Sequence, residues 1–316
     1  MLFVISNSQD ETANFLCDKL KGQLPFVRLD TDFQPEDIEM SLSSGRASLS
    51  FKGGHISAHD VSAVWFRRPK ALDLGIGNDK GERNHTNLEW AASLENFFSL
   101  IPIERWINHP SLNVIASNKI NQLQVADRLG FNVPRYLVTN SVEEAKNFLG
   151  VTEAQHIVKP LASGYIEREE GNDSLIYTNQ VTPQHMEKLN LVRTCPVLFQ
   201  VKVNKQLDVR ITVIDEQMTA VVLEKKVEDS QELDIRRDNM EGMHYRLIEL
   251  PASVRKGIEH LMSHYRLRFA AIDMAIDFEG NWWFFEVNPN GQWAWLDILG
   301  VSEIWRDFST CFKKEI

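Results

Sequence analysis

Two strand-like runs near the C-terminus flank a Glu279-Gly280 turn and predict a β-hairpin. With those two residues as the loop, Phe278 pairs with Asn281. Counting back from that pair sets Asp273 directly opposite Glu286. Directly opposite residues have Cβ atoms only about 4.5–5.5 Å apart, so two like charges there repel each other. A chain that folds this way needs a cation to compensate the pair.

Asn288 adds an amide oxygen to the same face of the expected hairpin. It lies two residues beyond Glu286, and alternate residues of a strand share a face. Two carboxylates and an amide oxygen are hard ligands that suit Mg²⁺ or Mn²⁺. Mg²⁺ usually completes its octahedron with water and phosphate oxygens. The sequence therefore predicts a metal site, with a metal that arrives together with a nucleotide.

The composition narrows the class of protein and of partner. The 316 residues are 43% hydrophobic and 25% charged, which is typical of a globular protein large enough for two or three lobes. The formal net charge of −10 argues against broad binding to nucleic acid or to an anionic membrane. The apolar run at the N-terminus is too short for a signal peptide, and no stretch approaches the roughly 18 apolar residues of a membrane span. We expect a cytoplasmic protein.

The cysteines agree with a reducing compartment. Cys17, Cys195 and Cys311 are odd in number, lie far apart and include no CxxC pair, which excludes a cysteine-based zinc site. Buried structural thiols are expected for all three.

The first third of the chain predicts an α/β lobe, because it opens strand, helix, strand. The expected elements are a buried strand over 2–6, a helix over 12–20, a strand over 25–30, a hairpin over 48–57, a strand over 61–67, a loop over 71–84 and a helix over 87–101.

The rest of the chain predicts mixed α and β structure. The expected elements are a helix over 117–129, an extended segment over 133–139, a helix from Ser141 to Gly150, strands over 156–160, 174–178, 197–203, 208–214 and 219–226, a short helix from Thr182, and the hairpin. Ser141 and Glu144 have the spacing of a capping box.

Two lysines are candidates for phosphate contact. Lys159 ends an apolar strand directly before Pro160 and the small-residue loop Ala162-Ser163-Gly164. An ammonium group can neutralise phosphate oxygens and loop amides can donate to them. Lys119 lies in the first turn of a helix. Taken singly, each lysine is better explained as a solvated surface residue, and the loop does not match a P-loop.

Asp208 and Arg210 share one face of an expected strand. A buried ion pair between them is one interpretation; ribose or metal contact by Asp208 and phosphate or carboxylate contact by Arg210 is the other. Farther on, Arg236 lies in a charged segment that reads either as a solvated basic patch or as part of a site. Arg67 and Arg68 follow two aromatic residues and suit either structural ion pairs or contacts to an acidic peptide.

These motifs stand in a fixed order along most of the chain. The series is Asn118-Lys119, Ile157-Val158-Lys159-Pro160, Phe199-Gln200, Lys205, Asp208-Val209-Arg210, Asp234-Ile235-Arg236, Asp273 and Glu286-Val287-Asn288-Pro289-Asn290-Gly291-Gln292-Trp293. It resembles the ATP-grasp superfamily, and more narrowly the peptide-modifying ligases of the microviridin (graspetide) type. The segment Val64-Trp65-Phe66-Arg67-Arg68-Pro69 resembles an N-terminal motif of the same group, which usually has tyrosine in place of Phe66.

The resemblance implies an α+β ATP-grasp fold in which two α+β lobes clasp ATP, preceded by an α/β pre-ATP-grasp lobe. The implied divisions are an N-terminal lobe over 1–112, a central lobe over 113–199 and a C-terminal lobe over 200–316. The segment 161–178 is then expected to cover the phosphates.

The same resemblance implies a role for each candidate. The phosphates would be held by Lys119 and Lys159, with Ser163 and Gly164 of the loop, and the adenine hinge would be formed by Gln200, Val201, Lys202 and Val203. The ribose would face Asp208, and catalysis on the phosphates and the acceptor carboxylate would involve Arg210 and Arg236. Two Mg²⁺ ions, or Mn²⁺, would be bound by Asp273, Glu286 and Asn288. Val201 departs from the pattern, because related sequences often have glutamate there.

The expected activity is an ATP-dependent, ADP-forming ligation of a carboxylate to an amine or hydroxyl. The expected substrate is a ribosomally made precursor peptide with a leader, cross-linked through an acyl phosphate into macrolactams or macrolactones. The alternatives are a ligase of the same fold that adds an amino acid or amine to a peptide or small acid, and a non-catalytic nucleotide-binding scaffold. A homodimer is a further expectation; a nucleic-acid or membrane partner is not expected.

Overall fold

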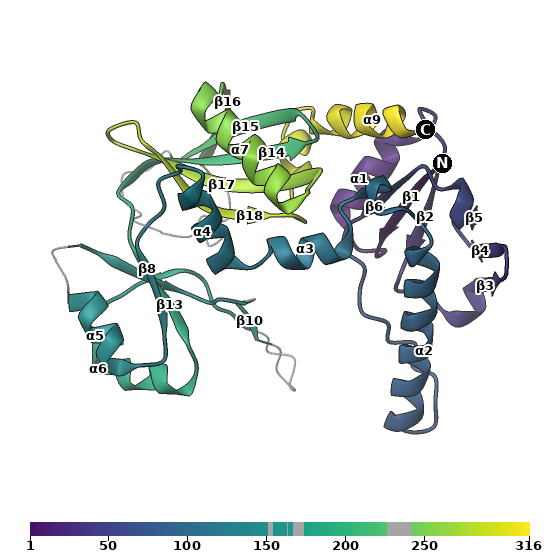
Figure 1. The fold of residues 1–316 in the computed structure, drawn as a ribbon, viewed down its shortest axis with the longest axis horizontal. Coiled ribbons are helices and arrows are strands. Elements are labelled where there is room, and N and C mark those ends of the chain that lie inside the picture. Colours follow the sequence, from purple (N-terminus) through teal and green to yellow (C-terminus); the bar gives the residue numbers. More distant parts are fainter. Residues whose placement is uncertain (151–153, 163, 167–173, 226–241) are drawn as a thin grey trace.

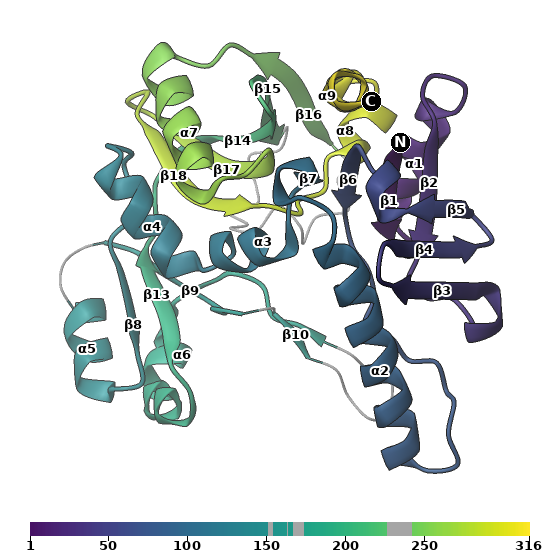
Figure 2. The same cartoon turned by 45° about the vertical axis from the view of Figure 1, so that its right-hand side comes forward.

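The computed structural model describes residues 1–150, 154–162, 164–166, 174–225 and 242–316. Figure 1 shows three lobes: an N-terminal lobe in purple and blue, a small teal lobe, and a green and yellow C-terminal sheet above it. Figure 2 shows the same lobes after a 45° turn, with helix α2 projecting from the N-terminal lobe. This mixed α/β arrangement matches the expected fold class.

The N-terminal lobe is built on a parallel sheet with strand order β2-β1-β6-β7. Its elements are β1 (Leu2–Ser6), α1 (Glu11–Leu20), β2 (Phe26–Asp30), β6 (Ala63–Phe66) and β7 (Trp106–Ile107). All five residues of β1 are buried, as expected for a parallel strand covered on both faces. Leu2 and Val4 pack with α1, whereas Phe3 and Ile5 pack toward α2 (Lys80–Ser99) and a second sheet.

That second sheet is antiparallel, with order β3-β4-β5. Its strands are β3 (Ile38–Ser43), β4 (Arg46–Phe51) and β5 (Gly54–Ser57), so the expected hairpin is confirmed. The expected loop over 71–84 is wrong at its end, because α2 begins at Lys80. The first turns of α2 carry almost no apolar residue, so hydrophobic spacing did not reveal them. Asp79 caps the helix by accepting from the amide of Glu82, a spacing that would have marked the start.

The central lobe has a four-stranded antiparallel sheet in the order β12-β9-β13-β8. Its elements are β8 (Tyr136–Thr139), α5 (Val142–Gly150), β9 (His156–Lys159), β12 (Asn179–Gln180), α6 (Pro183–Glu187) and β13 (Val197–Val201). A hairpin of β10 (Tyr165–Ile166) and β11 (Ser174–Leu175) extends from it. The Ser141 cap is confirmed, since its Oγ accepts from the Glu144 amide at 3.3 Å.

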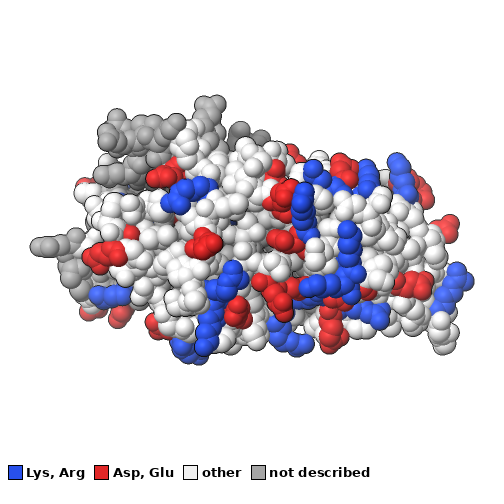
Figure 3. Space-filling view, turned by 90° about the horizontal axis from the view of Figure 1, so that it is seen from above, with Lys and Arg blue, Asp and Glu red and all other residues white. Residues whose placement is uncertain are grey.

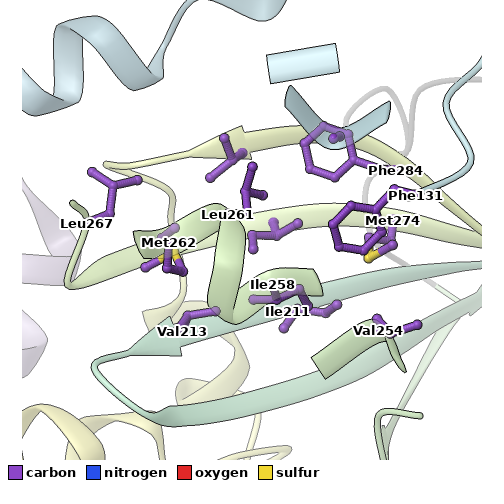
Figure 4. Packing of buried hydrophobic residues seen from close by; sticks show 14 of the residues in the cluster. Phe131, Ile211, Val213, Val254, Ile258, Leu261, Met262, Leu267, Met274 and Phe284 are labelled. Atoms are coloured by element: carbon purple, nitrogen blue, oxygen red, sulfur yellow. The ribbon is translucent and has the colours of Figure 1, made fainter. Parts of the chain in front are cut away.

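The C-terminal sheet has five antiparallel strands in the order β16-β15-β14-β17-β18. Its elements are β14 (Lys205–Ile214), β15 (Gln217–Lys225), β16 (Met243–Ile248), α7 (Ala252–Tyr265), β17 (Phe269–Asp277) and β18 (Trp282–Asn288). Figure 4 shows how Ile258 and Leu261 of α7 pack against Ile211 and Met274 of the sheet. Helix α4 (Lys119–Arg128), preceded by α3 (Pro110–Ala116), joins this core through Leu123, Val125 and Ala126.

The last helices return to the N-terminal lobe. α8 (Ala294–Ile298) and α9 (Ile304–Glu315) share a buried cluster with β1, β6 and α1. In that cluster Trp293 stacks on Phe308 with ring centroids 4.8 Å apart, and Trp65 contacts the same ring. The N-terminal sheet is therefore covered on one face by the C-terminal end of the chain. Short 3₁₀ turns lie at Pro35–Asp37, Ala58–Asp60, Ile103–Arg105 and Leu189–Thr194.

Basic and acidic side chains are interspersed on the face seen from above in Figure 3, as is usual for a solvated surface. Among the described residues, no helix combines the length and apolar character needed to cross a bilayer.

The cysteines differ in burial. Cys17 and Cys311 are buried as expected, but Cys195 is exposed, which corrects the expectation that all three thiols are buried. Cys195 lies between the 3₁₀ turn Leu189–Thr194 and β13, in a connection that runs over the surface.

Candidate active site

The register of the C-terminal hairpin sets Asp273 of β17 opposite Glu286 of β18. The predicted pairing is confirmed, but the loop is longer than expected. The amide of Asp277 donates to the carbonyl of Asn281, which leaves three residues, 278–280, in the turn. Gly280 has φ +84, the left-handed conformation that such turns need.

A second irregularity restores the register that the longer loop had shifted by one. The pairing passes from Met274↔Phe284 to Asp273↔Glu286, so Phe285 is the extra residue of a β-bulge. The two deviations cancel, and the carboxylates meet where a two-residue loop would have placed them. Asp277 stabilises the turn by accepting from the amides of Glu279 and Asn281 and from the Trp283 indole. The Trp283 hydrogen bond is the largest cause that lowers the pKa of Asp277 to about 2.

The polar residues lie on one face of the C-terminal sheet because its strands alternate. Val209, Ile211 and Ile272 point into the core beneath α7. Arg210 on β14 is registered with Asp273 on β17, and Asp273 with Glu286 on β18. Residues in register share a face, so the two carboxylates and the guanidinium form a row across three strands.

Arg210 compensates part of the negative charge in this row. Its Nη1 donates to Asp273 Oδ1 at 2.7 Å, and their side chains are 13% and 37% exposed. Asp208 has a different partner, Lys205, whose Nζ donates to both carboxylate oxygens at 2.6 and 2.7 Å. Asp208 and Arg210 thus share a face as predicted, but each pairs with another residue.

Asn288 completes the predicted metal-ligand set. It is registered with Ala271, two positions from the Asp273–Glu286 pair, and its Oδ1 accepts from the amide of Asn290 at 2.9 Å. That bond orients the amide oxygen and leaves it a second lone pair. Among the described residues, no cluster of three or more His, Cys, Asp and Glu side chains is placed to hold a metal. The set of two carboxylates and an amide, facing each other across two strands, has the hard oxygen donors that Mg²⁺ requires.

The outer edge of β18 is held by a buried glutamine that sequence reasoning missed. Gln122 of α4 is 2% exposed; its Nε2 donates to the Val287 carbonyl at 2.8 Å and its Oε1 accepts from the Val287 amide at 3.0 Å. Val287 lies between Glu286 and Asn288, so α4 fixes the strand that carries both. Gln122 lies inside the Asn118–Ala126 segment that carried the family resemblance, but its role needs the helix–strand contact.

Asn108, at the end of β7, is a second such residue. It is 1% exposed, donates to the carbonyls of Phe269 and Pro289, and accepts from the amides of Arg268 and Phe269. It therefore joins the N-terminal lobe to the start of β17 and to the loop after β18. A lone asparagine before His109 carries no pattern that would have indicated this.

The two candidate lysines lie around one loop. Lys119 Nζ donates to the carbonyls of Pro160 at 2.7 Å and Ala162 at 3.2 Å, which ties the first turn of α4 to the small-residue loop. Lys159 is registered with Leu198 on β13, on the opposite sheet face from the Phe199 cluster under α5. The structure therefore brings the α4 lysine to the loop that the strand lysine precedes.

The hinge segment is only partly available to a nucleotide. The amides of Val201 and Lys202 donate to the carbonyls of Arg135 and Gln155. Within the described residues, the amide of Val203 has no backbone hydrogen-bond partner, unlike the amides of its two predecessors. Gln200 is 1% exposed, and its buried Nε2 likewise has no partner in the described part of the chain. A buried amide without a partner is costly, so this side chain is an exception that stands out at the hinge.

Two predicted site residues, Ser163 and Arg236, lie outside the described residues, as does part of the expected cover over 161–178. Gly164 is described, and its carbonyl accepts from the Ile176 amide at 2.7 Å. A Cβ at Gly164 would lie 2.2 Å from the Ile176 carbonyl oxygen. Glycine is therefore required there for the β10–β11 hairpin to close.

The two adjacent arginines of the N-terminal lobe differ completely in exposure. Arg67 is 0% exposed, which favours the structural interpretation over a peptide contact for this residue, whereas Arg68 is exposed. Arg68 lines a cavity of about 310 Å³ together with Asn7, Gln9, Asp10, Glu11 and Gln292. The cavity lies at the carboxyl ends of β1 and β6. After β1 the chain continues to β2 on one side of β1, and after β6 it continues to β7 on the other side. That is the switch point of the sheet, where α/β folds commonly bind ligands.

Comparisons with known proteins agree with this architecture. Residues 1–113 match the model of the MvdD pre-ATP grasp domain. No curated protein sequence matches the chain. Among solved structures, the macrocyclase MdnC from Microcystis aeruginosa MRC, bound with precursor peptide MdnA, superposes with a TM-score of 0.82 at 25% identity, covering 98% of this chain and 97% of MdnC.

A Chryseobacterium gregarium RiPP-associated ATP-grasp ligase, in complex with ADP and a leader and core peptide, superposes with a TM-score of 0.88 at 26% identity, covering 100% of this chain and 97% of the other. The ATP-grasp ligase PsnB, complexed with a minimal precursor variant, Mg and ADP, has a TM-score of 0.73 at 20% identity over 99% of this chain and 98% of PsnB, which supports the fold alone.

Proposed function

We propose that this chain, which has the ATP-grasp fold and an MvdD-type pre-ATP-grasp domain, is an ADP-forming ligase that joins a side-chain carboxylate of a precursor peptide to an amine or hydroxyl of the same peptide. One observation carries the proposal: Arg210, Asp273 and Glu286 form a row across three strands of the C-terminal sheet, in a chain that aligns over nearly its whole length with a macrocyclase and an ATP-grasp ligase whose structures contain their peptides.

The reaction begins with attack by a carboxylate oxygen of the peptide on the γ-phosphorus of ATP. The bond from that phosphorus to the bridging oxygen of ADP breaks, and a carboxylic–phosphoric anhydride forms. The amine or hydroxyl then attacks the acyl carbon, its proton is lost, and inorganic phosphate leaves. Mg²⁺, when bound, screens the charge of the phosphate oxygens during this transfer.

The protein contributes position and charge to this chemistry. Asp273 and Glu286 would hold the metal, with Asn288 as the third oxygen donor; their shared sheet face supports this assignment. Arg210, beside them, is placed to neutralise the charge on the transferred phosphoryl group or on the acceptor carboxylate. Lys119 and Lys159 are assigned to the other phosphates, and the hinge at Gln200 and Val203 to adenine. Two metal ions, Mn²⁺ as a substitute, and a role for Ser163 and Arg236 remain parts of the proposal.

Arg68 is assigned to substrate recognition. It is exposed, lines the switch-point cavity beside Gln292, and has no hydrogen-bond or ion-pair partner for its guanidinium within the described residues. An acidic side chain of the core peptide would supply that partner. We therefore propose a leader-bearing peptide as the partner of this protein. We also propose that the protein is a homodimer and acts in the cytoplasm.

Mass spectrometry of co-expressed peptide tests the function. The chain is expressed with short peptides encoded beside its gene that carry repeated Thr, Ser or Lys and Asp or Glu near their C-terminal ends. The proposal predicts loss of one water for each cross-link, and no loss with the Glu286→Gln variant. Gain of a whole residue would indicate a ligase that adds an amino acid instead. An unchanged peptide mass, with no ADP formed in the purified reaction, would contradict a ligase.

A further inference from the structure

A buried guanidinium of the N-terminal lobe reaches into the loop that follows the metal-ligand strand. Arg67 directly follows β6 and is 0% exposed. Its Nη1 donates to the carbonyl of Asn290, and its Nη2 donates to Gln292 Oε1 at 2.9 Å. The first contact joins residues 223 positions apart in the chain. Arg67 is thus a direct link between the N-terminal sheet and the catalytic end of the C-terminal sheet.

The N-terminal lobe does not satisfy this charge by itself. Asp10 Oδ2 lies 3.7 Å from Arg67 Nε, too far for a hydrogen bond, and Nε has no such partner in the described part of the chain. Asp10 also accepts from Ser6 Oγ and from the first amides of α1. Burial, with the neighbouring charges of Arg68 and Arg210, outweighs Asp10 and lowers the pKa of Arg67 to about 10. The hydrogen bonds of its guanidinium therefore go mainly to the loop.

Gln292 contacts both Arg67 and Arg210, the proposed catalytic arginine. Its side-chain oxygen accepts from Arg67 and also from Thr12 Oγ1, so the N-terminal lobe holds the side chain from two directions. Its backbone carbonyl accepts from Arg210 Nη2 at 2.8 Å. The other nitrogen of the same guanidinium holds Asp273 at 2.7 Å. One residue thus connects Arg67 with Arg210.

The loop between these contacts has little freedom to adjust. A Cβ at Gly291 would lie 2.2 Å from Ala271 Cβ and 2.9 Å from Arg210 Nη2. The loop is therefore packed against both β17 and the catalytic guanidinium. A displacement at Gln292 is transmitted to Arg210 because close packing leaves no gap to absorb it.

We infer that Arg67 is a positioning residue: through Gln292 it fixes Arg210 beside Asp273, so that the N-terminal lobe sets the geometry of the phosphoryl-transfer centre. The catalytic consequence rests on the proposed ligase function, but the positioning itself does not. A fork with two donors is required for the two acceptors, which a lysine cannot replace.

The test compares Arg67→Lys with Arg28→Lys in the full chain. Arg28, on β2 of the same sheet, likewise donates hydrogen bonds from its guanidinium, but to Asp30, Asn14 and Asn7 of its own lobe. Gln292→Ala serves as a second variant, because Gln292 is itself exposed and uncharged, and its loss removes an acceptor of Arg67 without altering the guanidinium. Two readouts are taken: kcat and KM for ATP with the precursor peptide, and the ¹⁵N–¹H signal of Arg210 Nε in the protein alone.

Arg67→Lys and Gln292→Ala are expected to lower kcat about 10- to 100-fold, with KM for ATP within about twofold, because a small displacement of a catalytic group costs rate rather than ground-state binding. Both should shift or broaden the Arg210 signal, whereas Arg28→Lys should change neither readout. An Arg210 signal and a kcat equal to those of Arg28→Lys in both variants would overturn the inference. If the wild-type protein turns over no ATP, the ligase function fails, and the Arg210 signal alone then decides the inference.

Discussion

Arg210 Nη1 and Asp273 Oδ1 lie 2.7 Å apart on neighbouring strands of the C-terminal sheet. One was predicted as a catalytic cation and the other as a metal ligand, and the structure pairs them directly. Under the proposed function, the carboxylate assigned to the metal is therefore held in place by the guanidinium assigned to the phosphates. Asp273 is opposed by Glu286 on its other side, so removal of either partner changes the charge of the whole row.

Asp273→Asn is expected to reduce ADP formation by at least about 100-fold, because it removes a ligand charge and the partner of Arg210 together. The reduction is measured as the initial rate of ADP release in the presence of peptide and Mg²⁺. Glu279→Gln, an exposed carboxylate in the turn of the same hairpin, is the matched control and should retain wild-type rates. Equal rates for the two variants would remove Asp273 from the site.

Gly291→Ala is expected to lower kcat about 10- to 100-fold, because the added methyl group would overlap Ala271 and press on Arg210. Gly150→Ala, at the end of α5, is the control, since a Cβ there meets nothing within 4 Å. Steady-state kinetics and a thermal melt on both variants separate loss of activity from loss of fold. A fully active Gly291→Ala protein would show that the loop yields without moving the arginine.

Gln122→Ala is expected to destabilise the fold by about 3 kcal/mol, because it leaves the buried amide and carbonyl of Val287 without partners. Gln124→Ala, on the exposed side of the same helix, should change the free energy of unfolding by less than about 0.5 kcal/mol. Urea unfolding curves give both values. Similar losses in the two variants would mean that α4 does not hold β18.

Thiol chemistry should distinguish the cysteines. Burial raises the pKa of Cys17 to about 11, and burial with the nearby Asp215 charge also raises the pKa of Cys311. Iodoacetamide at pH 8 is therefore expected to modify Cys195 in the native protein and all three thiols after unfolding. Peptide mapping identifies the labelled sites, and labelling of Cys17 in native protein would contradict its burial.

The raised pKa of Cys17 also has a consequence for stability. The folded protein holds that proton more tightly than the unfolded chain, whose thiol titrates near ~8.5. This difference in pKa contributes its full stabilisation of the folded state below pH ~8.5. The stabilisation is lost as the pH rises toward about 11. Urea midpoints should fall over this interval, and less steeply in Cys17→Ala; identical slopes would contradict the assignment.

Local pattern was sufficient for the face and pairing of the metal-ligand strands, since both follow from alternation and from a count of residues. It reached the right pairing because a bulge that was not predicted offsets the one residue by which the predicted loop was too short. Pattern did not provide the partners of Asp208 and Arg210, because the neighbour of β14 that carries Asp273 lies 63 residues away along the chain. The burial of Arg67 depends on a loop 223 residues distant. Such contacts are set by how the lobes pack, which no local spacing encodes.

Trapping of the activated carboxylate with hydroxylamine tests the central claim most directly. The purified protein is incubated with its precursor peptide, ATP, Mg²⁺ and hydroxylamine, and hydroxamate on the peptide is quantified together with ADP. The account predicts a peptide hydroxamate on an Asp or Glu side chain, with one ADP for each, and neither product with Glu286→Gln. A wild-type protein that cross-links its peptide but gives no hydroxamate, or a Glu286→Gln variant that forms it at the wild-type rate, would contradict activation of the carboxylate by phosphorylation at this site.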